Sequence, residues 1–197
     1  MTPKDVPNPA AGLVVRRAEP GEVEAVLDPV VKLAKASATA ACWSREALYP
    51  YVATGEAGGV LQAKAIFLAC ANPSAGGAAA VAGDRPLGMV DGMVGFAAFS
   101  TIMTVGAGES TLENMAVAGP WQKQGIGGRL LSAGLLWCRA QAAARVFLEV
   151  RESNRAAIAL YERAGFSVVG NRPGYYREPL EDGLQMRKVL GLVARSG

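Results

Sequence analysis

The chain has 197 residues, a net charge of +3, and 51% hydrophobic but only 19% charged residues. This length and composition predict one well-filled core and argue against wholesale disorder. So small a net charge gives no argument for nucleic-acid binding. Histidine, the most common general base, is absent. Cys42, Cys70 and Cys138 lack a CxxC spacing, which argues against a disulfide framework and a zinc site.

The first ten residues, MTPKDVPNPA, lack the apolar core of a signal peptide. The longest uncharged stretches, near 65–83 and 92–108, are broken by Gly, Pro, Asn or Ser, which is untypical of membrane spans. We therefore expect a reduced, cytoplasmic protein that does not associate with a membrane. We expect a single domain over 1–197, with a frayed segment 1–12 and a loop insertion at 73–90.

The first half of the chain predicts a strand, two helices and an antiparallel meander. The apolar run 13–17 indicates a strand, and apolar periodicity indicates helices over 20–36 and 44–53, with Ser44 as N-cap of the second. Three further apolar runs, separated by Gly-rich segments, predict the meander strands: 59–71, 93–105 and 110–117.

The second half predicts alternating helices and strands. A helix over 125–143 would place Ile126, Leu130, Leu131, Leu135 and Leu136 on roughly one face. A strand over 145–150 follows, and then a helix over 154–164 that ends before Gly165. Segments 166–169 and 185–193 complete the sheet, which is predicted to be mixed in strand direction.

Positive charge gathers in the second half of the chain. Residues 1–120 carry 8 Lys and Arg against 11 Asp and Glu, whereas residues 121–197 carry 12 against 6. Two interpretations are open: ordinary solvated surface charge, or a site that attracts an anion.

The basic half opens with a glycine-rich stretch, QKQGIGGRLL, at 122–131. It indicates either a tight turn into a helix or a phosphate held on backbone N–H groups. A Walker A loop would need Lys and then Ser or Thr after its last glycine, and a dinucleotide fingerprint would need GxGxxG. Neither is present, because Arg129 and Leu130 follow Gly128. What remains is a QxxGxG loop between a strand and a long helix.

A second stretch, LEVRESNRAAIALYERAGF at 148–166, gives this loop a context. The two stretches together resemble the GNAT superfamily of acyl-CoA-dependent N-acetyltransferases, and within it the ribosomal-protein alanine N-acetyltransferases. Met115-Ala116-Val117 before the loop and the RPGYY segment 172–176 support the resemblance. It implies an α+β fold: a GNAT-like mixed, mostly antiparallel central sheet flanked by helices, with two strands splayed to hold acyl-CoA.

The resemblance also implies acetyl-CoA as co-substrate, with no metal. The residues that match the family's cofactor contacts are Met115, Ala116, Val117, Lys123, Gln124, Gly125, Ile126, Gly127, Gly128 and Asn154. Within this set, the strand residues would meet the pantetheine amides and the loop residues the pyrophosphate. Asn154 has a second interpretation, as the N-cap of the helix that it precedes.

Two residues match the family's catalytic positions. Tyr161 matches the tyrosine that protonates the departing thiolate, although its helical face also suits a core residue. Glu149 matches the proposed general base. It lies in an apolar run where an unpaired carboxylate would be costly, so a salt bridge to an arginine is the structural alternative.

The resemblance implies a transfer of acetyl to the α-amine of a protein or peptide N-terminus. The N-terminal alanine of a small ribosomal-subunit protein is the candidate acceptor, bound by the early helices and the RPGYY loop. One alternative is an N-acetyltransferase for small amines or lysine, and another is a non-catalytic CoA-binding sensor. Cys138 resembles a nucleophile only in residue type, because its apolar neighbours predict core packing.

Overall fold

The computed structural model describes residues 12–37, 43–53, 62–71, 92–103 and 108–191. The predicted frayed segment 1–12, apart from Gly12, and the predicted loop insertion 73–90 lie outside them. The described strands form one sheet in the order β1-β2-β3-β4-β5-β7-β6. Their bounds are β1 Leu13–Arg17, β2 Gln62–Ala71, β3 Met93–Met103, β4 Gly108–Val117, β5 Ala143–Arg151, β6 Ser167–Arg177 and β7 Leu180–Val189.

The sheet is mixed, as predicted. The strand pairs are antiparallel except β4 with β5, which is parallel, and β2, β3 and β4 form the predicted meander. The chain passes from β4 to β5 through η2 (Gly119–Trp121) and α3 (Ile126–Ala140). A parallel neighbour needs such a crossover because a tight turn can join only antiparallel strands.

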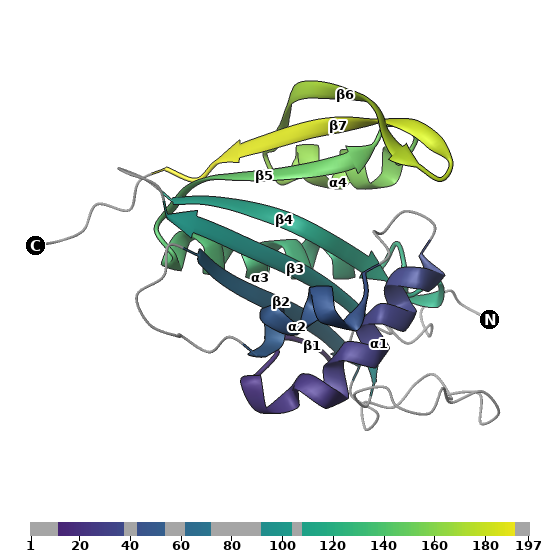
Figure 1. The fold of residues 1–197 in the computed structure, drawn as a ribbon, viewed down its shortest axis with the longest axis vertical. Helices are drawn as coiled ribbons and strands as arrows, with labels where there is room; N and C mark the ends of the chain where they lie inside the picture. The colour runs from purple at the N-terminus through teal and green to yellow at the C-terminus, as the bar shows by residue number, and fades with distance from the viewer. Residues whose placement is uncertain (1–11, 38–42, 54–61, 72–91, 104–107, 192–197) are drawn as a thin grey trace, which may run out of the picture.

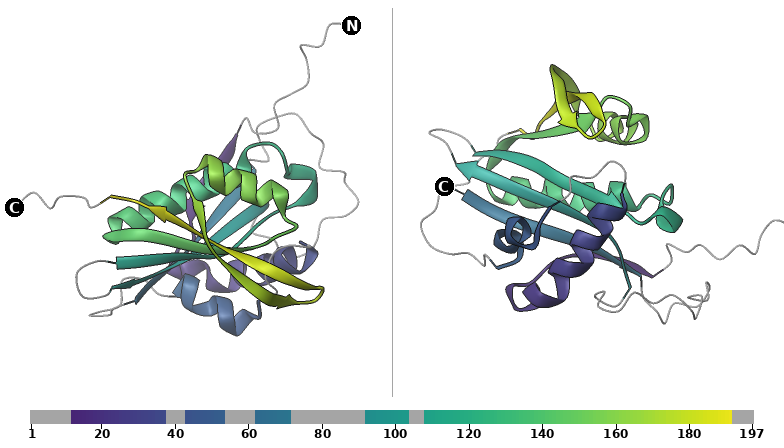
Figure 2. Two further views of the ribbon diagram at one scale, coloured as in Figure 1. Left: turned by 90° about the horizontal axis from the view of Figure 1, so that it is seen from above. Right: turned by 45° about the vertical axis from the view of Figure 1, so that its right-hand side comes forward.

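Helices cover both faces of the sheet (Figures 1 and 2). On one face, α1 (Val23–Ala36, preceded by η1 Pro20–Glu22) and α2 (Arg45–Ala53) bury a core that includes Leu27, Leu48 and Phe96. On the other face, α3 and α4 (Arg155–Arg163) bury a second core that includes Phe99, Leu130 and Leu148. Alternate residues of a strand point to opposite faces, so each central strand contributes to both cores.

Local signals explain where α2 begins and where α4 ends. Ser44 Oγ accepts a hydrogen bond from the backbone N–H of Ala47 at 3.3 Å, which confirms the predicted N-cap of α2. Helix α4 ends at Arg163, and Gly165 follows with a left-handed φ of 88°, as helix C-termini favour. No helix in the described ranges is both long and apolar enough to cross a membrane.

Three details of the sequence-based prediction are wrong. Helix α3 ends at Ala140 rather than 143, because the chain turns at Ala142, whose φ is 57°. Leu136, expected on the buried face of α3, is 66% exposed, whereas Gly134, Trp137 and Cys138 are buried instead. Strand β6 continues to Arg177 rather than ending at 169, and β7 covers Leu180–Val189 rather than 185–193, so the RPGYY segment lies within β6 rather than in a loop.

Gly134 gives a test of the packing between α3 and β3. A Cβ at this position would lie 2.0 Å from the ring of the fully buried Phe99. We expect Gly134→Ala to lower the free energy of unfolding by about 1–2 kcal/mol, because overpacking outweighs the gain in helix propensity. Guanidinium denaturation would measure the change. In Gly128→Ala, on the same helix, the new Cβ would meet only Leu160 at 3.8 Å, so no loss is expected.

Cys138 gives a test of the same core by chemical labelling. The side chain is fully buried, as the sequence predicted, and burial raises its pKa to about 11. A raised pKa keeps the thiol protonated at pH 8, and only the thiolate reacts readily. We expect iodoacetamide at pH 8 to leave Cys138 unmodified in the folded protein and to modify it after unfolding, as read by peptide mapping. Labelling of Cys138 before the half-buried Cys70 would contradict this packing.

Candidate active site

The parallel strands β4 and β5 separate part-way along their length. Their paired positions end at Leu112 and Leu148, but β4 continues to Val117 beside β3, and β5 continues to Arg151 beside β7. In Figure 1 the two strands lie together at the left of the view and diverge toward the right. The edges that face each other past the split therefore have backbone N–H and C=O groups without a strand partner, and such groups require another one. We call this region the wedge.

The predicted strand residues lie on the β4 side of the wedge. Met115 and Val117 are partly buried against the core beneath α3, and Ala116 is buried in the core beneath α1 and α2. All three lie past Leu112, where β4 pairs only with β3. An extended molecule with amide groups could bind this edge as an added strand does.

The predicted glycine loop connects the end of β4 to the N-terminus of α3. Gln122 Nε2 donates to the Val117 carbonyl at 3.0 Å, and Gln124 Nε2 donates to the Pro120 carbonyl at 3.0 Å, which fixes the loop. Gly125 is the N-cap of α3, with a φ of 79° in the left-handed region that glycine favours. The N–H groups of the first helical turn, from Ile126 to Gly128, have no acceptor within the helix. The structure thus gathers the predicted loop residues at one helix end.

Several features of this helix end suit an anionic ligand such as a pyrophosphate. The N-terminus of a helix attracts negative charge through its free N–H groups and its dipole. A Cβ at Gly125 would have no neighbour within 4 Å, so the backbone is open to a ligand there. Gln124 Oε1 is buried without a hydrogen-bond partner in the described structure; as an acceptor it suits an N–H or O–H of acyl-CoA rather than the pyrophosphate itself. The residues therefore fit the polar part of acyl-CoA.

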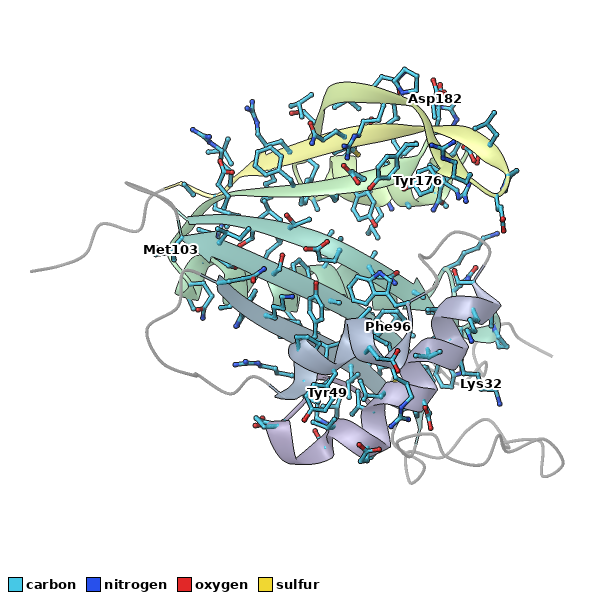
Figure 3. All side chains as sticks on the ribbon, viewed as in Figure 1. Lys32, Tyr49, Phe96, Met103, Tyr176 and Asp182 are labelled. Atoms are coloured by element: carbon cyan, nitrogen blue, oxygen red, sulfur yellow. The ribbon has the colours of Figure 1, made fainter. Side chains whose placement is uncertain are left out.

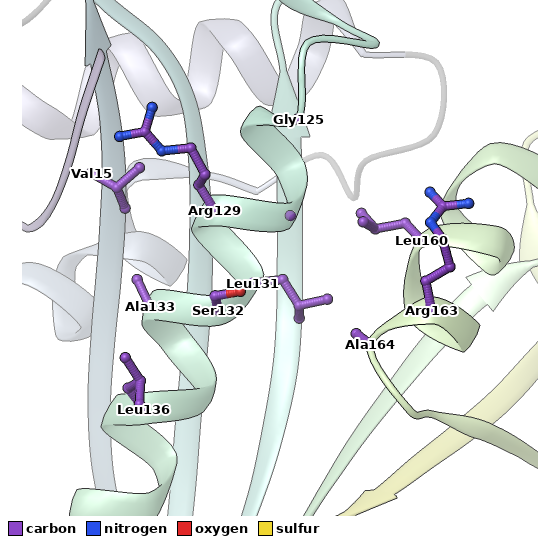
Figure 4. A pocket seen from close by; sticks show the side chains of 11 residues that line it. Val15, Gly125, Arg129, Leu131, Ser132, Ala133, Leu136, Leu160, Arg163 and Ala164 are labelled. Atoms are coloured by element: carbon purple, nitrogen blue, oxygen red, sulfur yellow. The ribbon is translucent and has the colours of Figure 1, made fainter. Parts of the chain in front are cut away.

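A hollow of about 610 Å³ extends from this helix end between α3 and α4 (Figure 4). Its lining includes Gly125 and Gly128 from the loop, and Leu160 and Arg163 from α4. Arg129 also borders it while its Nη2 donates to the Leu13 carbonyl at 2.6 Å. The two arginines give the hollow the positive charge that the sequence indicated for this half of the chain.

Helix α4 carries two predicted site residues. Asn154 is its N-cap, with Oδ1 accepting from the backbone N–H of Ala157 at 3.2 Å, so the capping interpretation is confirmed. Tyr161, two turns later, is 7% exposed and packs 5.9 Å from the ring of Phe166. Burial raises its pKa, and so does the nearby Tyr176. The phenol therefore stays protonated at neutral pH, as a proton donor must.

Glu149 is the first residue of β5 past the split. Its carboxylate forms an ion pair with Arg172 of β6, and its side chain is 25% exposed. The salt-bridge alternative from the sequence is therefore confirmed, and it explains how a carboxylate follows an apolar run without a large desolvation cost. Glu149 Oε1 makes this contact, and the carboxylate also forms a hydrogen bond with the Tyr175 side chain.

Aromatic rings of β6 surround this ion pair. The Arg172 guanidinium lies 4.5 Å over the Tyr175 ring, and Tyr175 contacts Tyr176 edge to face at 5.1 Å. The hydrogen bond to the Glu149 carboxylate is the first cause of a raised Tyr175 pKa, ahead of burial. The RPGYY segment therefore lies beside Glu149, although as part of a strand.

Contacts from the end of β5 and within the β6–β7 hairpin hold this segment in place. Arg151 pairs with Glu181 at 3.1 Å and lies 4.2 Å over the Tyr176 ring. Asp182 Oδ1 accepts from the Gly174 backbone N–H at 2.8 Å. Figure 3 shows Tyr176 on the side of the hairpin toward β4 and Asp182 on the opposite side.

Sequence reasoning missed two residues at this site. Glu113 of β4 follows Leu112 as Glu149 follows Leu148, and Tyr51 of α2 lies close enough for the Glu113 charge to affect its pKa. The charge of Glu113 beside the apolar Leu112 was a signal, but the face to which its side chain points depends on a β-bulge that the sequence does not reveal. Within the described ranges, no group of three or more Cys, Asp or Glu side chains is placed to hold a metal ion.

Comparisons with known proteins agree with this geometry. Residues 46–166 match the model of the acetyltransferase (GNAT) family. The chain is 42% identical over 84 residues to the ribosomal protein bS18-alanine N-acetyltransferase of Escherichia coli strain K12, a match that covers 43% of this chain and 55% of that enzyme. The chain thus spans about half the length of the curated relatives it matches.

Solved structures extend the likeness of the fold to nearly the whole chain. The crystal structure of the ribosomal-protein-S18-alanine N-acetyltransferase from Escherichia coli has a TM-score of 0.64 at 26% identity, covering 94% of this chain and 98% of that one. Arabidopsis thaliana NAA60 in complex with acetyl-CoA has a TM-score of 0.66 at 14% identity, covering 90% and 98%. The family match, which takes in the wedge, the loop and α4, settles the classification: this chain belongs to the acetyltransferase (GNAT) family.

Proposed function

We propose that the protein transfers the acetyl group of acetyl-CoA to the α-amine of a protein N-terminus. This proposal rests on the split between β4 and β5. Glu149 is the first residue of β5 past the split, and the buried Tyr161 lies on α4, the helix that follows β5. The relatives' names suggest the N-terminal alanine of ribosomal protein bS18 as the acceptor. Acetyl-CoA would lie in the wedge, with its pyrophosphate at the N-terminus of α3 and its amides along Met115–Val117.

The proposed chemistry is a direct attack of the amine on the thioester. Glu149 accepts one proton from the ammonium group of the acceptor, which leaves the neutral amine. The new C–N bond forms as the C–S bond breaks, Tyr161 donates its proton to the departing thiolate, and the Tyr161 phenolate then takes the second proton that the acetylated nitrogen loses. Holding the amine beside the thioester supplies much of the remaining acceleration.

The cost of the neutral nucleophile favours an α-amine. An α-amino group has a reference pKa of about 7.7–8.0, and a lysine side chain about 10.4. Deprotonation at pH 7 therefore costs about 1 kcal/mol for a protein N-terminus and roughly 4–5 kcal/mol for lysine. One partly exposed carboxylate, already paired with Arg172, suits the easier of the two tasks.

Three acceptors distinguish this function from its alternatives. The purified protein and acetyl-CoA would be mixed with a peptide that has a free N-terminal alanine, with an N-blocked peptide containing lysine, and with a polyamine. We expect mass spectrometry to find the added acetyl group on the free α-amine alone. Modified lysine or polyamine would contradict the acceptor assignment, and binding of acetyl-CoA without transfer would favour a sensor.

Tyr161→Phe tests the proposed acid. We expect kcat to fall about 100-fold, a typical contribution of a positioned general acid. The KM for acetyl-CoA and the unfolding midpoint should change little, because the phenylalanine ring can keep the contact with Phe166. Thiol release in a colorimetric assay would measure the rate. Tyr49→Phe, on the exposed side of α2, is the control and should leave kcat unchanged. An unchanged kcat in Tyr161→Phe would show that the residue only fills the core.

A further inference from the structure

Two glutamates, rather than one, lie where β4 and β5 begin to separate, which we call the mouth of the wedge. Leu112 and Leu148 are the last paired positions of β4 and β5, and both belong to the core beneath α3 and α4. Glu113 and Glu149 come next in their strands, so both point to the opposite face. That face, between α2 and the β6–β7 hairpin, is where the aromatic rings around Glu149 lie.

A β-bulge gives Glu113 this position. In the pairing of β3 with β4, Ala98 is opposite Asn114 and Phe99 is opposite Leu112, which leaves Glu113 as the extra residue. Bulges redirect a side chain and are common next to active sites. A 2.6 Å hydrogen bond from Ser100 Oγ to Glu113 Oε1 confirms the direction of the Glu113 side chain. Ser100 is on the same face of β3 as Ala98 and Phe96, which lie in the core beneath α1 and α2.

The charge of Glu113 reaches both sides of the mouth. Burial comes first in raising the pKa of Tyr51 on α2, and the Glu113 charge comes second. The same charge also contributes to the raised pKa of Tyr175 on β6, after Glu149 and burial. Glu113 therefore lies between the two elements that border the face.

The Glu113 carboxylate is exposed and has no ion-pair partner among the described residues. Its hydrogen bond from Ser100 is its one direct polar contact in that part of the chain. Arginines pair instead with the carboxylates of Glu22, Glu24, Asp28, Glu109, Glu149 and Glu181. The nearby Lys64 lies 4.9 Å over the Tyr51 ring rather than in an ion pair. Because Arg172 pairs with Glu149, Glu113 is the one of these two carboxylates without an ion-pair partner among the described residues.

We propose that Glu113 is a specificity residue that binds the acceptor's ammonium group before Glu149 removes a proton from it. The inference rests on the proposed function, because it names the group of the acceptor that the same site recognises. An α-amine is largely protonated at neutral pH, so the acceptor arrives as a cation with three N–H donors. A carboxylate with a free oxygen offers it a charge-assisted hydrogen bond. Glu113 then contributes to binding and Glu149 to the chemical step.

The first test measures binding rather than turnover. Calorimetry would compare a peptide with a free N-terminal alanine and its N-acetylated form, each added to the protein saturated with CoA. We expect the wild type to prefer the charged peptide, and Glu113→Gln to weaken its binding about tenfold while leaving the acetylated peptide unaffected. Glutamine keeps an acceptor for Ser100, so the fold should be retained. Glu109→Gln, on the same strand beside Arg145, is the matched control and should behave as wild type.

Kinetics then separates recognition from proton removal. In Glu113→Gln we expect the KM for the acceptor to rise about tenfold with kcat within about twofold, whereas Glu149→Gln lowers kcat. Equal weakening of both peptides, an unchanged preference, or a fall in kcat at constant KM would overturn the proposal. A wild type that prefers the charged peptide but acetylates no acceptor would instead contradict the proposed function and leave the recognition by Glu113 standing.

Discussion

The loss of backbone pairing between β4 and β5 is the constraint on which the rest of the site depends. A parallel pair in the middle of a sheet normally continues, because unpaired backbone groups there are costly. Here each strand keeps its other neighbour: β4 stays with β3 as far as Val117, and β5 stays with β7 as far as Arg151. The sheet therefore divides into two halves without either half losing its own pairing.

The two halves contribute different parts of the site. The half with β1 to β4 carries the glycine loop, Glu113 and the helices α1 and α2, whereas the half with β5 to β7 carries Glu149, Arg172 and the tyrosines of β6. Helix α4 follows β5 and places Tyr161 in the core on the opposite face. A molecule between the strands would thus meet a proton acceptor on one face of the sheet and a proton donor on the other.

Much of this fold was readable from the sequence, because its elements follow local rules. Apolar periodicity marked the helices, apolar runs between Gly-rich segments marked the meander, and Ser44 and Gly165 marked helix ends. The direction of Leu136 was not readable, since a helix with small residues such as Gly134 can turn a different stripe inward. The length of β6 was missed because Pro and Gly in RPGYY suggest a loop, whereas the hairpin contacts of Arg151 and Asp182 stabilise the strand.

The site was only partly predictable for a related reason. The loop and α4 are contiguous segments, so their residues could be named together, whereas the partners of Glu149 come from a strand 23 residues later in the chain. Glu113 was missed because the bulge is a property of two paired strands and not of one segment. Motif reading thus finds residues that are close in sequence, and the tertiary structure adds those that are close only in space.

Helix α4 has one more consequence for any molecule bound at this site. Asn154 caps the helix through Oδ1, and Tyr161 follows seven residues later, so both lie on the same side of the helix axis. At 1.5 Å per residue, their Cα atoms are separated by about 10 Å along that axis. The separation is rigid, because the capping bond and the packing of Tyr161 hold both ends of the same short helix. A ligand that touches both side chains must therefore be extended rather than compact, and a shorter acyl carrier could engage only one of them.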